Sequence, residues 1–180
     1  MNNHEIRLSG SGGQGIITAG IILAEAALLD GRNALQSQSY GPEARGGASK
    51  AEVIISDEEI DYPKVSAPGI LLALTQEAFN NYVQGVTAEG VILVDESITA
   101  NPSANQHIFR LPILETAQAR LRPVVANIIA LGAMAKLTGC VSLDALEKAV
   151  LARVPRGTED LNKRALATGV ELAENQQKYN

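Results

Sequence analysis

Apolar and polar positions in the first third of the chain alternate between the period of a strand and that of a helix. Residues 4–9 (HEIRLS) alternate and predict a strand. Residues 15–31 then carry apolar side chains at helical spacing until Gly31, which predicts a helix that ends there. Residues 33–38 and 50–56 predict two more strands, separated by a glycine-rich segment.

Continuous apolar runs dominate the next part of the chain. Residues 69–75 (GILLALT) and 90–97 (GVILVDES) each have the length of a buried strand, and a short helix follows the first from Gln76. Residues 107–112 predict a weaker edge strand. Further helices are predicted to begin near Ile113, Val124, Leu143 and Thr158.

Strands that alternate with helices predict an α/β fold with a mostly parallel sheet covered on both faces, and we expect a single domain over residues 1–180. Ligands of such sheets bind outside the carboxyl ends of the strands. The loops expected at that edge are residues 10–15, 39–49, 75–76 and 95–96.

Composition narrows the function classes. Aromatic residues make up only 3% of the chain, so its core must consist of Ala, Val, Ile and Leu. The formal net charge of −5, without a basic stripe, argues against a nucleic-acid partner. Cys140 is the only cysteine, which excludes an internal disulfide and a cluster held by this chain alone, and favours the reducing cytoplasm. No secretory signal is evident at the N-terminus.

The longest apolar stretch, residues 124–135 (VVANIIALGAMA), is shorter than the roughly 20 residues that span a bilayer. We interpret it as a buried helix whose small residues let neighbouring backbones approach closely. Asn127 is a lone polar group in this run and needs a hydrogen-bond partner if it is buried.

The first loop at the expected ligand edge is rich in glycine. Gly10, Gly12 and Gly15 satisfy the G-x-G-x-x-G pattern between a predicted strand and helix, and backbone N–H groups at a helix start favour an anion. The acidic residue that holds a dinucleotide ribose is missing from residues 34–38, and no P-loop lysine follows. Independent NAD or FAD binding is therefore disfavoured, while a phosphate cradle and a simple tight turn both stay open.

The second loop contains residues 39–49 (SYGPEARGGAS). Tyr40, Glu43 and Arg45 supply a ring, a carboxylate and a guanidinium among turn-forming residues, a mixture suited to presenting side chains to a ligand or partner. The alternative is a surface loop with an internal ion pair between Glu43 and Arg45.

Other reactive residues favour structural roles. His4 and His107 have no ligand partners at metal spacing, and no serine lies in a nucleophile elbow, so we predict neither a metal site nor a catalytic residue in this chain. Cys140 lies in an apolar setting and is expected to be inert. Asp95, at the end of a predicted strand, is expected to cap a helix or loop.

Several segments together resemble the gamma subunit of 2-oxoacid:ferredoxin oxidoreductases, especially the 2-oxoglutarate type. The segments are GSGGQGIITAGIILAEAA, QSYGPEARGGASKAEVIIS, IDYPKV, LLALTQEAFNNY and VVANIIALGAMAKLTG. The resemblance implies a Rossmann-like three-layer α/β/α sandwich in a complex that converts a 2-oxoacid and coenzyme A into acyl-CoA, carbon dioxide and reduced ferredoxin. Gly69 departs from the family pattern, where an aspartate is expected.

The resemblance also implies how the chemistry is divided. Thiamine diphosphate with Mg²⁺ and the iron–sulfur clusters would belong to thiamine-binding alpha and beta subunits and a ferredoxin-like delta subunit, since this chain has no Gly-Asp-Gly segment and one cysteine. This chain would help to enclose the active site and to bind coenzyme A. The residues expected to do so are Gly10, Gly12, Gly13, Gln14, Gly15, Tyr40, Gly41, Glu43, Arg45, Gly46 and Gly47.

Alternatives to this function stay open at this point. The complex could use pyruvate or a branched-chain 2-oxoacid, because substrate choice should depend on residues near the thiamine cofactor. From other classes, the chain could be a stand-alone dinucleotide-binding module or a purely structural homodimer.

Overall fold

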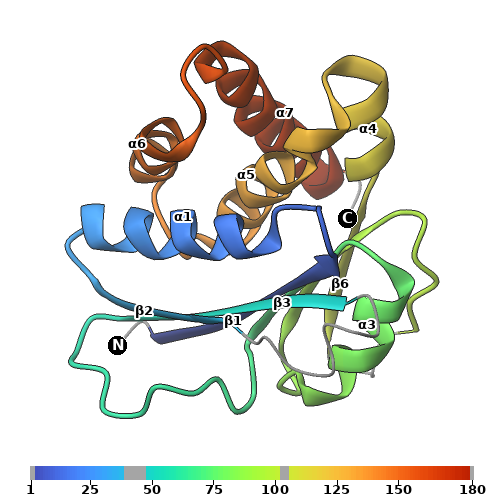
Figure 1. Ribbon diagram of the computed structural model, residues 1–180. Coiled ribbons are helices and arrows are strands. Elements are labelled where there is room, and N and C mark those ends of the chain that lie inside the picture. The colour runs from blue at the N-terminus through green and yellow to red at the C-terminus, as the bar shows by residue number, and fades with distance from the viewer. Residues whose placement is uncertain (1–2, 39–47, 102–105, 179–180) are drawn as a thin grey trace.

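A six-stranded sheet forms the centre of the computed structural model, which describes residues 3–38, 48–101 and 106–178 (Figure 1). The strand order is β2-β3-β1-β4-β5-β6. Strands β1, β4, β5 and β6 run parallel, whereas β3 is antiparallel to both of its neighbours, β1 and β2. The mostly parallel sheet is thus confirmed. The strands are β1 Asn3–Ser11, β2 Asn33–Gln38, β3 Ala48–Ser56, β4 Ile70–Ala73, β5 Val91–Asp95 and β6 His107–Leu111.

Helices cover the two faces of the sheet unequally. Figure 1 shows α1, α4, α5, α6 and α7 together on one face and α3 on the other, so the three-layer architecture is confirmed with one thin outer layer. The α-helices are α1 Ile16–Leu29, α3 Gln76–Tyr82, α4 Ile113–Arg120, α5 Ala126–Thr138, α6 Leu143–Arg153 and α7 Glu159–Lys178. Two short 3-10 helices are η1 Val83–Gly85 and η2 Pro123–Val125. No helix in the described part of the chain has the length and apolar character needed to cross a membrane.

Two apolar clusters, one on each face, hold the layers together. The larger joins the sheet to α1, α5, α6 and α7, and the smaller packs α3 on the opposite face of β4 and β5. Leu71 and Leu72 are neighbours on β4 and belong to different clusters, because successive strand side chains point to opposite faces. This two-sided burial explains the continuous apolar runs of the central strands.

The thinly covered face is closed partly by charges. Arg7 on β1 lies directly across from Glu52 on β3, and its Nε donates to Glu52 Oε1 at 2.8 Å. The guanidinium also lies 5.5 Å from the centroid of the Tyr82 ring. Lys50 lies 3.5 Å from the same carboxylate and 5.6 Å from the same ring. The two cations and one carboxylate thus cover the part of the sheet beside α3.

Helix α5 lies at the centre of the helical layer. Its ten residues from Ala126 to Ala135 are all buried, as the apolar run predicted. Its helical turns begin two residues later than expected, because η2 occupies residues 123–125. Glycines bring α5 and α7 together: a Cβ at Gly132 would collide with the carbonyl oxygen of Leu166, and one at Gly169 would lie 2.9 Å from the nitrogen of Ala133.

The α5–α7 contact predicts that Gly169→Ala destabilises the protein. Alanine normally favours a helix over glycine by about 1 kcal/mol, but here its methyl group would push the two backbones apart, at a cost typical of overpacking, about 1–3 kcal/mol. We expect a lower melting temperature in thermal unfolding.

Gly69→Ala is the matched control, because nothing lies within 4 Å of its added Cβ. It should change stability by less than about 0.5 kcal/mol. If Gly169→Ala were as stable as the control or the wild type, the close backbone contact would be refuted.

Candidate functional site

The carboxyl ends of the parallel strands meet at one edge of the sheet. The amino end of the antiparallel strand β3 lies at this edge as well, because Ala48 pairs with Ser11 at the end of β1. Gln38, which ends β2, pairs with Ala51 nearby. The described residues on either side of the second loop therefore lie beside the glycine loop. The loop residues themselves lie outside the described residues: Tyr40, Gly41, Glu43, Arg45, Gly46 and Gly47.

Within the glycine loop, Gln14 closes the turn from inside. The side-chain Oε1 of Gln14 accepts the backbone N–H of Ser11 at 2.7 Å. The backbone N–H of Gln14 donates to the Ser11 carbonyl oxygen at 3.3 Å. A Cβ at Gly10 would collide with Oε1 of Gln14. A larger residue at position 10 would therefore displace the Gln14 side chain, which here shapes the loop.

Gly15 connects the loop to α5. It precedes α1 with φ 69°, in the left-handed region that favours glycine, and Asn127 Nδ2 donates to its carbonyl oxygen at 3.1 Å. A Cβ at Gly15 would lie 2.5 Å from that Nδ2. Asn127 is only 7% exposed, and its Oδ1 accepts the Ile128 N–H at 2.9 Å. The partner that the sequence required for Asn127 is thus the loop itself.

The other two glycines of the loop differ from each other. Gly13 has φ 88°, so a side chain there would be strained. Gly12 is not among the glycines with positive φ, and nothing lies within 4 Å of its added Cβ. The conformational requirement for glycine therefore lies at Gly13 and Gly15.

The sheet topology removes the usual ribose site of a dinucleotide. In the dinucleotide-binding fold, the second strand lies beside the first and its end carries the acidic residue. Here the antiparallel strand β3 lies between β1 and β2. The third glycine of that motif normally allows helix and strand to pack closely. In this chain Gly20, five residues after the motif, allows that close packing, since its added Cβ would lie 2.8 Å from Ala51 Cβ.

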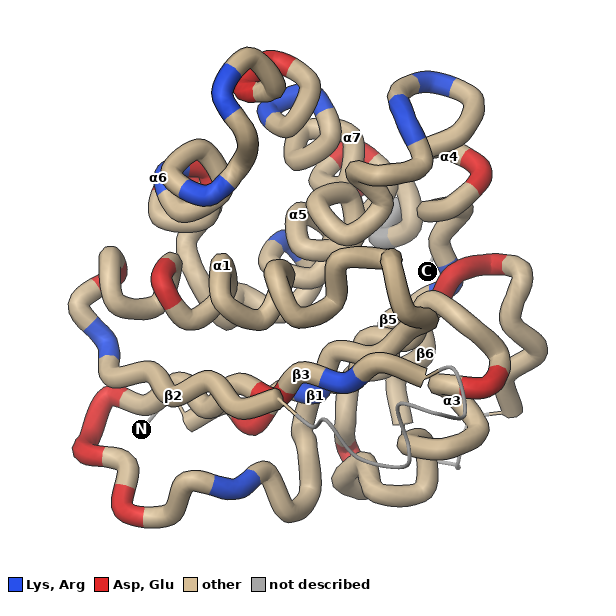
Figure 2. Tube along the Cα trace, viewed as in Figure 1, with Lys and Arg blue, Asp and Glu red and all other residues tan. Residues whose placement is uncertain are grey.

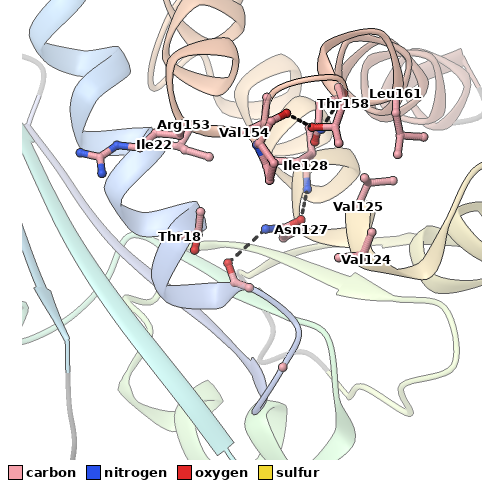
Figure 3. A pocket seen from close by; sticks show the side chains of 14 residues that line it. Thr18, Ile22, Val124, Val125, Asn127, Ile128, Arg153, Val154, Thr158 and Leu161 are labelled. Carbon is pink, nitrogen blue, oxygen red and sulfur yellow. Dashed lines mark hydrogen bonds between the residues drawn. The ribbon is translucent and has the colours of Figure 1, made fainter.

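A cavity of about 260 Å³ opens beside the glycine loop, between α1, α5 and the start of α7 (Figure 3). Gly13, Thr18, Asn127, Thr158 and Asn162 provide polar groups to its wall. The amides of both asparagines already have partners, because Asn162 Nδ2 donates to the Thr158 carbonyl oxygen at 2.9 Å. Most of the remaining lining is apolar: Ile22, Val124, Val125, Ile128, Val154, Pro155 and Leu161.

A second cavity, of about 430 Å³, lies on the other side of Val124. Gly12, Gly13, Gln14, Leu114, Gln118, Pro123, Val124 and Ala126 line it. Gly13 and Val124 contribute to both cavities. The Val124 side chain is 71% exposed although it begins an apolar run. The prediction that the whole apolar run is buried missed this exposed residue. Pro123, which starts η2, was the sequence signal that a separate turn precedes the buried helix.

The loops after β4 and β5 are occupied by structural hydrogen bonds. Asp95, only 2% exposed, accepts the Leu114 N–H at 2.8 Å and the Ser97 N–H at 3.1 Å. Its expected capping role is thereby confirmed. Thr75 caps α3 by accepting the Ala78 N–H at 3.2 Å. Gln76 joins the two loops through hydrogen bonds with the Thr99 backbone at 2.8 and 3.0 Å.

The perturbed pKa values of Cys140, His4 and Glu96 do not mark a reactive centre. Burial raises the pKa of the Cys140 thiol, which agrees with an inert cysteine. Partial burial and then the Arg32 charge lower the pKa of His4. Partial desolvation, followed by a hydrogen bond and charge repulsion from Glu115, raises the pKa of Glu96. Among residues 3–38, 48–101 and 106–178, no group of three His, Cys, Asp or Glu side chains is placed to hold a metal ion.

Comparisons with known proteins identify what the chain is similar to. The family model for pyruvate ferredoxin/flavodoxin oxidoreductase matches residues 5–172. The chain is 51% identical to the 2-oxoglutarate synthase subunit KorC of Methanocaldococcus jannaschii, over 94% of this chain and 93% of that protein. The chain is 33% identical to the pyruvate synthase subunit PorC of Methanothermobacter marburgensis, over 93% of this chain and 96% of that protein.

A solved structure gives the same result for the fold. The gamma subunit of a keto/oxoacid ferredoxin oxidoreductase from Geobacter sulfurreducens superposes with a TM-score of 0.89 at 49% identity, over 98% of this chain and 99% of that one. The expected resemblance and fold class are both confirmed.

The geometry of the glycine loop predicts different responses at two of its glycines. Gly15→Ala should cost about 2 kcal/mol, because a left-handed conformation alone costs a non-glycine residue roughly 1–2 kcal/mol and the methyl group would also displace Asn127. We expect the melting temperature to fall by about 4–8 °C. Gly12→Ala is the control and should melt within about 2 °C of the wild type, since its Cβ has free space.

A double-mutant cycle with Asn127→Ala separates the contact from backbone strain. The two losses should not add, because both variants break the same contact. Equal melting temperatures for Gly15→Ala and Gly12→Ala, or strict additivity with Asn127→Ala, would contradict this account.

Proposed function

Because the chain belongs to the pyruvate ferredoxin/flavodoxin oxidoreductase family, we propose that it is the gamma subunit of a 2-oxoglutarate:ferredoxin oxidoreductase. The assembled complex would convert 2-oxoglutarate and coenzyme A into succinyl-CoA, carbon dioxide and reduced ferredoxin. One observation carries the choice of substrate. The chain is 51% identical to a 2-oxoglutarate synthase subunit over nearly its whole length, against 33% for a pyruvate synthase subunit.

Residues of this chain do not fit the cofactors that such a reaction requires. An iron–sulfur cluster needs several thiolates, whereas the single cysteine, Cys140, is buried with a raised pKa. The chain also contains no Gly-Asp-Gly segment for a thiamine-bound metal. We therefore assign thiamine diphosphate, Mg²⁺ and the clusters to alpha, beta and delta subunits, where the cofactors supply the chemistry.

The proposed contribution of this chain is a rigid wall of the active site. Gln14 and Asn127 hold the glycine loop from both sides. The first helical hydrogen bond of α1 runs from the Ala19 N–H to the Gly15 oxygen, so the preceding N–H groups point out of the helix start, where an anion is favoured. Together with the second loop, whose flanks lie at the same edge, they would contact coenzyme A or a partner subunit.

Reconstitution tests this function. The chain is expressed alone and with the thiamine-binding and ferredoxin-like subunits encoded in the same genome, and coenzyme A-dependent dye reduction is followed with three 2-oxoacids. We expect activity only in the complex, with 2-oxoglutarate preferred to pyruvate and to a branched-chain 2-oxoacid. Turnover by the isolated chain, preference for another 2-oxoacid, or micromolar binding of NAD, NADP or FAD in calorimetry would overturn the proposal.

Arg45 in the second loop generates a separate prediction. Arg45→Ala should leave the melting temperature of the isolated subunit nearly unchanged but lower the activity or assembly of the complex. Loss of a contact with an anionic group should cost about 1.5–3 kcal/mol, roughly ten- to a hundredfold in affinity. Both the Michaelis constant for coenzyme A and the dissociation constant of the complex are measured, which separates a ligand contact from a partner contact.

Arg45→Lys is the matched control. It keeps the charge but loses the planar fork, so only partial rescue is expected if the contact is bidentate. Wild-type values of both constants and of turnover in Arg45→Ala would leave the second loop as a surface loop without this role.

A further inference from the structure

An apolar ridge of the protein surface lies beside the glycine loop. The ridge consists of Pro123 and Val124, and a cavity lies on each side of Val124. Both cavities also reach Gly13. With 71% of its surface exposed, Val124 is more exposed than any other large hydrophobic residue of the described chain. An apolar projection between two hollows is a shape that fits apolar side chains of another protein.

Cations without ion-pair partners border this ridge. Arg122 directly precedes it, and Arg156 follows Pro155, which lines the first cavity. Both arginines are exposed, and neither forms an ion pair with another described residue. Figure 2 shows Lys and Arg on the segment after α4 and on the turn between α6 and α7. By contrast, Arg153 in the cavity wall is bound to Glu25.

We infer that the ridge of Pro123 and Val124, with its two cavities, docks a partner subunit of the complex. The partner would insert apolar side chains into the hollows and offer carboxylates to Arg122 and Arg156. This inference rests on the proposed function, which requires partner subunits. The unpaired arginines of this rim favour a partner surface that carries carboxylates, although the chain as a whole is acidic, with a net charge of −5.

Three amide side chains around the cavities already have hydrogen-bond partners within the fold. Gln14, Asn127 and Asn162 already donate or accept hydrogen bonds within the fold. In the described residues, no buried side-chain nitrogen or oxygen lacks a partner. Apolar side chains of a partner need only the space and the apolar lining that the cavities provide.

A second exposed apolar surface of the protein lacks this combination. Leu28 and Leu29 at the end of α1 are 58% and 57% exposed beside α6. The cations around them are already neutralised, Arg153 by Glu25 and Lys148 by Asp144. Leu28 therefore provides a control of similar exposure and chemistry without the unpaired cationic rim.

The test compares Val124→Asp with Leu28→Asp in the reconstituted complex. Both substitutions place a carboxylate on an exposed site, so both subunits should fold and melt like the wild type. Val124→Asp should weaken assembly about tenfold or more, as central interface residues do, and Leu28→Asp should not. The dissociation constant is measured by calorimetry or by titration in size-exclusion chromatography.

A charge-reversal pair tests the cationic rim. Arg156→Glu should weaken assembly, with a smaller salt dependence than the wild type, because an attraction between charges is lost. Lys64→Glu is the control, since Lys64 is also exposed but lies in the segment between β3 and β4, away from the ridge.

The outcomes distinguish the docking surface from the proposed function of the chain. Assembly of Val124→Asp with wild-type affinity overturns the docking surface and leaves the proposed function intact. A raised Michaelis constant for coenzyme A at unchanged assembly overturns it in favour of a ligand surface. Self-association of the wild type that Val124→Asp abolishes, without binding of the other subunits, overturns it in favour of a second copy of this chain. Failure of the wild type to assemble or to oxidise 2-oxoglutarate refutes the proposed function itself.

Discussion

The hydrogen bond from Asn127 to the Gly15 carbonyl oxygen is the contact on which the geometry of the candidate site depends. It joins residues 112 positions apart and ties the glycine loop to the most buried helix, α5. Helix α5 is in turn held by α7 through the close approaches at Gly132 and Gly169. The loop therefore has the rigidity of the helical layer, although its own sequence is rich in glycine. A loop fixed in this way loses little further conformational entropy when it meets a ligand or partner.

The antiparallel strand β3 is the second constraint on the site. By lying between β1 and β2, it separates the glycine loop from the strand end that would hold a ribose. The same insertion brings the start of β3, at Ala48, level with Ser11. One topological feature thus removes the usual dinucleotide site and brings the flanks of the second loop beside the glycine loop. A glycine motif of the nucleotide-binding type is in this way compatible with a different partner.

The sequence predicted the elements well because their signals are local. Apolar periodicity and glycine or proline breaks located every described strand and α-helix to within a few residues. The direction of β3 was not predictable, since an apolar pattern is the same for parallel and antiparallel pairing. Asn127 could be flagged as needing a partner, but the identity of that partner depends on how α5 crosses the start of α1. For residues 39–47 the sequence remains the only guide, and the roles given to Tyr40, Glu43 and Arg45 stay predictions.

Val124 shows why the burial of individual residues was harder to predict than the positions of the helices. It begins an apolar run whose next members are core, and periodicity alone assigns it to the same core. The 3-10 turn η2 changes this, because Val125 is buried while Val124 remains exposed between the two cavities. Asn127 lies only three residues further along the same chain segment. The proposed docking ridge and the hydrogen bond that holds Gly15 therefore belong to one short chain segment, residues 123–127.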